Sequence, residues 1–148
     1  MKNFFLALFL SPIICFAQDH VSEFWKIDKW RTNKVINAQS TEFYLTNPED
    51  NKKNTIYGNF IIFQKDGTFA SKYYARCGND CFPSSRGTFK KIDDNHIHLR
   101  INSFKQHGLT RGCPPIDDPT QRDLGIFKIE PTKEGYRLIK SPISSSNP

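Results

Sequence analysis

Seven short runs of β-branched and aromatic residues, separated by turn residues, occupy the chain between Lys34 and Lys140. Runs of this kind, bounded by Gly, Asn, Asp and Pro, are typical of β-strands in a sandwich or barrel. They span residues 35–45, 56–64, 68–76, 86–92, 96–101, 124–130 and 136–140. The pattern predicts an all-β fold, in which an antiparallel meander of about eight strands closes into a barrel.

Residues 96–101 show the clearest alternation, because polar residues separate Ile97, Leu99 and Ile101. Alternation with a period of two places these three side chains on one face of a strand. The segment 24–31 is ambiguous, since its apolar residues fit one face of a short N-terminal helix but would also fit a first strand. A first strand there would bring the barrel to about eight strands, which is enough for closure.

The first 17 residues have the pattern of a cleaved secretory signal. Lys2 precedes an apolar stretch from Phe4 to Ile14, and Ala17 is the small residue before the expected cut. This stretch is shorter than the run of about 20 residues that a transmembrane helix needs. We therefore predict a signal peptide over residues 1–17, a secreted or periplasmic protein, and no transmembrane segment.

The remaining chain is expected to form a single domain over residues 18–140, followed by a flexible Ser- and Pro-rich tail over 141–148. Cys15 lies late in the signal, where lipidation would tether the protein to a membrane. Lipidation favours a small residue directly before the cysteine and a Leu-like residue three before it, whereas Ile14 and Pro12 stand there. We therefore favour the free form over the anchored one.

Three cysteines, Cys77, Cys81 and Cys113, remain after the predicted cut. In an oxidising compartment two of them should pair. A bridge to Cys113 would constrain the unfolded chain more, but the Gly-Asn-Asp turn between Cys77 and Cys81 favours the local pair. We predict the Cys77–Cys81 disulfide. Zinc would need a fourth ligand, for which His107 is the nominee, and we expect no metal.

Complete catalytic motifs are absent from the sequence, which has no G-x-S-x-G and no Gly-rich phosphate loop. Asp117 and Asp118 fit solvated loop carboxylates. His96 and His98 would place two imidazoles on one strand face, but Arg100 shares that face and would repel a cation. We therefore expect surface histidines, no cofactor and no enzymatic activity. The net charge of +6 is spread along the chain, which favours a solvated surface over a nucleic-acid partner.

An early Trp25 is followed by "FIIFQKDGTF" (residues 60–69) and "RGTFKKIDDNHIHL" (residues 86–99). This succession of strands and turns resembles small bacterial lipocalin-like, calycin-type β-barrel domains over residues 24–140. The resemblance implies a non-enzymatic protein that binds a small apolar molecule or lipid inside its barrel. Alternation along the strands predicts the side chains that would line this interior: Phe60, Ile62, Phe69, Phe89, Ile97, Leu99 and Phe127.

The connections between the predicted strands point to a second hypothesis. Antiparallel strands reverse direction, so the short connections 65–67, 93–95 and 131–135 should share one end, and the long ones 46–55, 77–85 and 102–123 the other. Long loops on a rigid scaffold commonly carry binding groups. The alternative function is therefore an envelope protein-interaction module or inhibitor acting through loops 77–85 and 102–123. Its expected contacts are Phe82, His107, Arg111 and Ile116.

Overall fold

The computed structural model describes residues 21–49, 56–76 and 78–142. The predicted signal segment, Cys77 and most of the predicted tail therefore lie outside the described residues. Within them, a short helix α1 (Val21–Phe24) precedes one antiparallel sheet of 9 strands. The strands are β1 (Lys29–Thr32), β2 (Glu42–Thr46), β3 (Gly58–Phe63), β4 (Thr68–Tyr74), β5 (Phe82–Asp93), β6 (His96–His107), β7 (Ile116–Asp118), β8 (Arg122–Thr132) and β9 (Gly135–Lys140).

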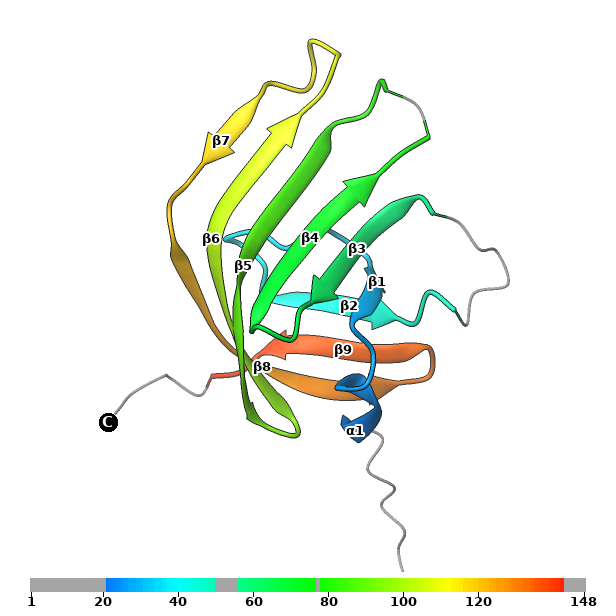
Figure 1. Cartoon of the computed structure of the whole chain (residues 1–148), viewed down its shortest axis with the longest axis vertical. Coiled ribbons are helices and arrows are strands. Elements are labelled where there is room, and N and C mark those ends of the chain that lie inside the picture. Colours follow the sequence, from blue (N-terminus) through cyan, green and yellow to red (C-terminus); the bar gives the residue numbers. More distant parts are fainter. Residues whose placement is uncertain (1–20, 50–55, 77, 143–148) are drawn as a thin grey trace, which may run out of the picture.

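The sheet closes on itself, because its first strand β5 also pairs with β6. The strands follow one another in the order β5-β4-β3-β1-β2-β9-β8-β6, while β7 pairs only with the last part of β6 (Figure 1). The predicted all-β antiparallel barrel is thus confirmed, and segment 24–31 supplies both the end of a helix and most of a strand.

The strand order departs from a sequential meander at one place. β1 lies between β2 and β3, so β2 pairs with the C-terminal strand β9 and not with its successor β3. β2 and β3 therefore run in the same direction, so β2 ends at one end of the barrel and β3 begins at the other. Alternation could not reveal this, because it reports which face a strand buries and not which neighbour it pairs with.

The turns and longer loops separate to the two ends of the barrel as expected from strand parity, with one exception. Connection 46–55 was expected at the same end as 77–85 and 102–123, but Thr46 and Asn47 lie beside Lys133 and Glu134, at the other end. The turns 64–67, 94–95 and 133–134 lie with α1 at what we call the α1 end, and residues 78–81 and 108–115 lie at the opposite, loop end (Figure 1). Gly135 has a φ of +147°, and a Cβ there would lie 2.2 Å from the Leu45 carbonyl oxygen. Only glycine therefore suits this tight turn.

Residues 35–41 were expected to form the first part of the strand 35–45, but they belong to a loop over 33–41 whose apolar residues enter the barrel. Ile36 is fully buried in the core, and its N–H donates a hydrogen bond of 3.2 Å to the Ser71 hydroxyl. Ser40 helps to hold the loop, because its hydroxyl accepts a hydrogen bond from the Asn37 N–H. Burial of Ile36 thus fills the interior from the loop end.

The α1 end is closed by aromatic side chains. Phe24 stacks on Trp30 with ring centroids 5.6 Å apart, and its edges meet Phe63 and Tyr136 at 5.8 and 5.5 Å. Phe24 and Trp30 are each 1% exposed. The remaining buried core comprises Phe43, Leu45, Ile61, Phe69, Ile97, Leu99, Ile101, Leu124, Phe127, Ile129 and Leu138.

Candidate functional site

The first candidate site is the barrel interior. Of the seven side chains predicted to line it, Phe69, Ile97, Leu99 and Phe127 are buried in the core, and Phe89 packs against that core half-buried. Alternation was therefore a reliable guide on these strands, which have one apolar and one polar face.

The placement of Phe60 and Ile62 inside the barrel is wrong. In the β1–β3 register, Arg31 is paired with Phe60 and the inward-facing Trp30 with Ile61, so Phe60 faces outward. The Lys29 ammonium lies 4.7 Å and the Arg31 guanidinium 5.0 Å from the centre of the Phe60 ring, which they cover. Because residues 60–63 are all apolar, alternation could not tell the two faces of this strand apart.

The described pockets open to solvent at the surface. The largest, of about 650 Å³, lies at the α1 end and is lined by polar residues such as Glu23 and Lys133 beside the edges of Trp30 and Tyr136. A second, of about 390 Å³, lies between Trp25 and the β3–β4 turn. The space between the strands is occupied by the aromatic and aliphatic core side chains.

The second candidate site is the loop end, where the structure corrects the predicted disulfide. Cys81 is bonded to Cys113, with 5.3 Å between their Cα atoms, and not to Cys77. β5 and β6 pair up to Phe82 and His107, so the two chain segments leave the sheet side by side. This long-range pairing brings Cys113 to Cys81 and outweighs the local turn that favoured Cys77.

The two loops joined by this disulfide are closely packed. A Cβ at Gly108 would lie 2.6 Å from the Cβ of Cys113 and 3.1 Å from the Asp80 carbonyl oxygen, so only glycine fits between them. The Tyr73 hydroxyl donates a 3.0 Å hydrogen bond to the Asp80 carboxylate, which raises the pKa of Tyr73. The two loops are therefore joined to each other by a covalent bond, and the first is held to β4 by the Tyr73–Asp80 hydrogen bond.

The four predicted contact residues all lie at or beside the loop end. Phe82 and His107 are register partners whose rings stack with centroids 5.3 Å apart. Arg111 is exposed in the loop, and Ile116 is 39% exposed at the start of β7. Leu109 is 87% exposed, the highest value among the large hydrophobic side chains described as exposed.

The two histidines of the H-x-H motif each contact a different carboxylate. His96 Nδ1 lies 2.9 Å from both Asp93 oxygens, and His98 Nε2 lies 2.6 Å from Asp123 Oδ1. No group of three His, Cys, Asp or Glu side chains suited to a metal ion occurs among the described residues. Both histidines are therefore engaged with carboxylates on the sheet surface.

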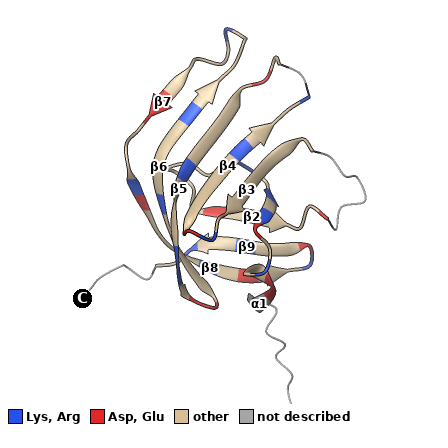
Figure 2. Ribbon diagram, viewed as in Figure 1, with Lys and Arg blue, Asp and Glu red and all other residues tan. Residues whose placement is uncertain are grey.

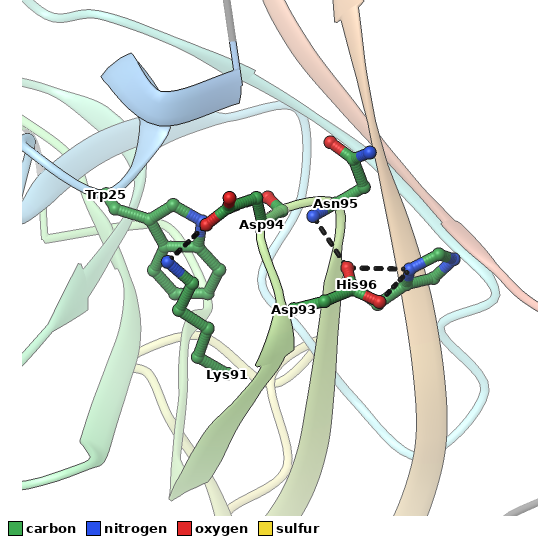
Figure 3. Close-up of polar contacts among 6 residues, drawn as sticks. All are labelled: Trp25, Lys91, Asp93, Asp94, Asn95 and His96. Atoms are coloured by element: carbon green, nitrogen blue, oxygen red, sulfur yellow. Dashed lines mark hydrogen bonds and ion pairs between the residues drawn. The ribbon is translucent and has the colours of Figure 1, made fainter. Parts of the chain in front are cut away.

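Figure 3 shows how the β5–β6 turn is tied to α1 and its neighbours. The Trp25 indole N–H donates a 3.0 Å hydrogen bond to the Asp94 carbonyl oxygen. The Lys91 ammonium lies 5.0 Å from the centre of the Trp25 ring and 2.6 Å from the Asp94 carboxylate. Trp25, which anchored the resemblance to lipocalin-like domains, thus covers the turn at the closed end of the barrel.

Several surface carboxylates have lowered pKa values. Hydrogen bonds from Thr120 and from the Arg122 guanidinium lower the pKa of Asp118 from 3.8 to about 2. Partial burial opposes ionisation of Asp93 and Asp123, but hydrogen bonds outweigh it, chiefly from His96 to Asp93 and from the Gly125 N–H to Asp123. The pKa values of both are lowered as a result. These carboxylates therefore favour the folded state when ionised.

Acid should destabilise the fold through these groups. A carboxylate with a lowered folded pKa contributes stability above its unfolded pKa and loses it as the pH falls through the folded value. For Asp118 the window lies between 3.8 and about 2. We expect urea unfolding to give a constant free energy near neutral pH and a falling one in this window. Asp118→Asn should show a shallower fall than the wild type, and equal slopes would contradict this assignment.

The described part of the chain contains no helix long and apolar enough to cross a membrane. The carboxylates with lowered pKa values lie on the sheet surface, and they do not line one common cleft. The loop end is thus the part of the molecule where a covalent brace and exposed apolar and cationic side chains coincide. No protein-family model, curated protein or solved structure matches this chain.

Proposed function

We propose that this is a non-enzymatic, secreted or periplasmic protein that binds an envelope protein through its loop end, acting as an interaction module or inhibitor. The observation that carries the proposal is the Cys81–Cys113 disulfide, which joins the two loops after β4 and β6. A braced loop loses less conformational entropy on binding than a free one. The bond therefore favours a preformed binding surface over a loop that must be ordered by its partner.

The chemistry of the exposed side chains supports the same reading. Leu109 is almost fully exposed in the loop that holds Cys113, and Ile116 is partly exposed three residues after that cysteine. Exposed apolar groups with an adjacent arginine are typical of interface anchors, and Arg111 follows Leu109 by two residues. Phe82 and His107 add a stacked ring pair at the base of the loops.

Binding of a small apolar molecule inside the barrel, the first expectation from the sequence, is the less favoured reading. Phe24 and Ile36 enter the barrel from its two ends, and the core side chains between them are buried. A ligand there would have to displace packed aromatic rings, which is costly in a close-packed interior. Native mass spectrometry of the purified protein measures this directly, since a mass excess lost on denaturation would favour the ligand reading.

An oxidising compartment is consistent with the disulfide, because such bonds persist in secreted and periplasmic proteins and are rare in the cytosol. The predicted signal over residues 1–17 leads to the same compartment. The partner is therefore sought in the envelope and not in the cytosol.

Replacing Phe82 and Arg111 together by alanine should reduce capture of the partner by at least about tenfold, since hot-spot anchors each contribute about 2 kcal/mol or more. The measurement is quantitative capture from envelope extract on the immobilised protein, with the captured protein identified by mass spectrometry and its affinity remeasured in purified form.

The matched control is Ile92→Ala with Lys133→Ala, which removes one exposed apolar and one cationic side chain near the α1 end. This control should bind as the wild type does. Equal capture by both double variants, or capture of no specific protein by the wild type, would argue against the proposal. Retained near-UV circular dichroism establishes that both variants are folded.

A further inference from the structure

A group of cations lies on the outer face of three neighbouring strands, below the loop end. Lys72 lies on β4, Arg86 on β5 and Lys105 on β6, and Figure 2 shows blue segments on each of these neighbouring strands. We call these three residues the basic cluster. None of its members is among the contact residues of the proposed function, of which Phe82 and His107 lie at the ends of the same strands β5 and β6.

The strand register places the basic cluster on one surface. Lys72 is paired with Ser84, and Ser84 in turn with Lys105, so these three form one row across the sheet. Arg86, paired with Ser103, occupies the next row. Adjacent strands are about 4.8 Å apart and diagonal neighbours roughly 7–8 Å. Three long cationic side chains can therefore reach a common point.

Burial shows that this surface is the outer one. Ser71 and Ser85, which alternate with the cluster residues, are 0% and 1% exposed inside the barrel. Lys72 and Arg86 must therefore point outward. A pocket of about 270 Å³ opens there, lined by Lys72, Ser84, Ser85, Arg86, Ser103 and Lys105.

The charges of the cluster are only partly neutralised. Lys105 forms an ion pair of 3.0 Å with Asp117 on β7. Lys72 and Arg86 form no ion pair or side-chain hydrogen bond with any residue that the structure describes. Like charges on adjacent strands repel each other, so the cluster is stabilised when an anion is bound. Two serine hydroxyls lie between the cations as additional donors.

We propose that the basic cluster is a binding site for a phosphate group. Arg86 offers a planar pair of N–H donors that suits a tetrahedral oxyanion. Lys72 and Lys105 provide positive point charges. Ser84 and Ser103 provide hydroxyl donors. The pocket is slightly smaller than the roughly 300–1,000 Å³ typical of small-molecule sites. It suits a phosphate group together with the small moiety that carries it. This site goes beyond the proposed function and uses none of the same residues.

The test uses two double variants with the same change in charge. The cluster variant carries Lys72→Gln and Arg86→Gln, and the control carries Lys65→Gln and Lys133→Gln. Lys65 and Lys133 are exposed at the α1 end, away from the pocket. Inorganic phosphate is titrated into each protein and followed through the backbone amide shifts of residues 72, 84–86 and 103. In parallel, sedimentation measures binding to vesicles with and without phosphatidylglycerol. Thermal melts establish that both variants remain folded.

We expect the cluster variant to bind phosphate or phosphatidylglycerol vesicles at least about tenfold more weakly, since it loses two of the three cations and their charge-assisted hydrogen bonds. The control should stay within about twofold. Shifts with inorganic phosphate identify a free phosphate as the ligand, and binding to phosphatidylglycerol vesicles alone identifies a lipid headgroup. The absence of both, or equal losses in cluster variant and control, would overturn the proposal. Neither result depends on the capture experiment at Phe82 and Arg111.

Discussion

Replacing Trp30 by alanine is expected to lower the free energy of unfolding by about 3–5 kcal/mol, the usual range for a large aromatic residue in a packed core. Trp30 is 1% exposed and joins α1 to the barrel through its contacts with Phe24 and Tyr136, at 5.6 and 5.4 Å between ring centroids. Alanine would leave a cavity that the closed β-sheet cannot collapse around. Urea unfolding followed by far-UV circular dichroism measures the loss.

Trp30→Phe separates packing from hydrogen bonding. The Trp30 indole Nε1 is buried without a hydrogen-bond partner among the described residues, so removal of this N–H forfeits no bond. Phenylalanine keeps the ring contacts with Phe24 and Tyr136. We expect its destabilisation to be less than half that of alanine. Equal losses for both substitutions would contradict the role of aromatic packing at this end of the barrel.

The second large effect is expected from the disulfide. Replacing Cys81 and Cys113 together by serine should cost about 3–4 kcal/mol, because the bond restricts the unfolded chain over a long loop. The two cysteines are 32 residues apart in sequence. Chemical unfolding of the oxidised wild type against the double variant measures the difference. Cys77→Ser serves as the control, since the Cys81–Cys113 bond remains possible in it.

The pairing itself can be checked by non-reducing peptide mapping. Cleavage after Arg76, Arg86, Arg111 and Arg122 leaves Cys77 and Cys81 in one peptide, and Cys113 in another. The Cys81–Cys113 bond predicts that residues 77–86 and 112–122 appear as one linked species that separates on reduction. Two unlinked peptides in the oxidised protein would contradict it. The same linked species in Cys77→Ser distinguishes Cys81 from Cys77 as the partner of Cys113, and its absence there would also contradict the pairing. The double variant in which serine replaces Cys81 and Cys113 should also weaken capture of the partner, because the two loops at the loop end are then no longer joined.

Part of the candidate site could be predicted from local sequence, and part could not. Phe82, His107, Arg111 and Ile116 were expected at one end of the barrel from strand parity, and the structure places them there. Parity held for these residues because each tight turn reverses the chain, but it failed for connection 46–55, because β1 lies between β2 and β3. The basic cluster was missed, because Lys72, Arg86 and Lys105 are far apart in sequence. Only the pairing of β4, β5 and β6 brings them together.

The same distinction explains the errors on single residues. Phe60 was assigned to the interior, but residues 60–63 are all apolar, so the sequence does not show which face of this strand is turned inward. What decided its orientation was the register with β1, which sets Lys29 and Arg31 over its ring. The local turn favoured Cys77 for the disulfide, but the paired ends of β5 and β6 bring Cys113 beside Cys81.

The sequence by itself determined the all-β class, the tight turns and most of the interior face, because these follow from alternation and turn chemistry over a few neighbouring residues. The tertiary structure alone decided the position of β1 between β2 and β3, the partner of Cys81 and the gathering of the basic cluster. These features depend on contacts between residues distant along the chain. Such contacts form only when the sheet closes, and no local pattern encodes which strands will meet.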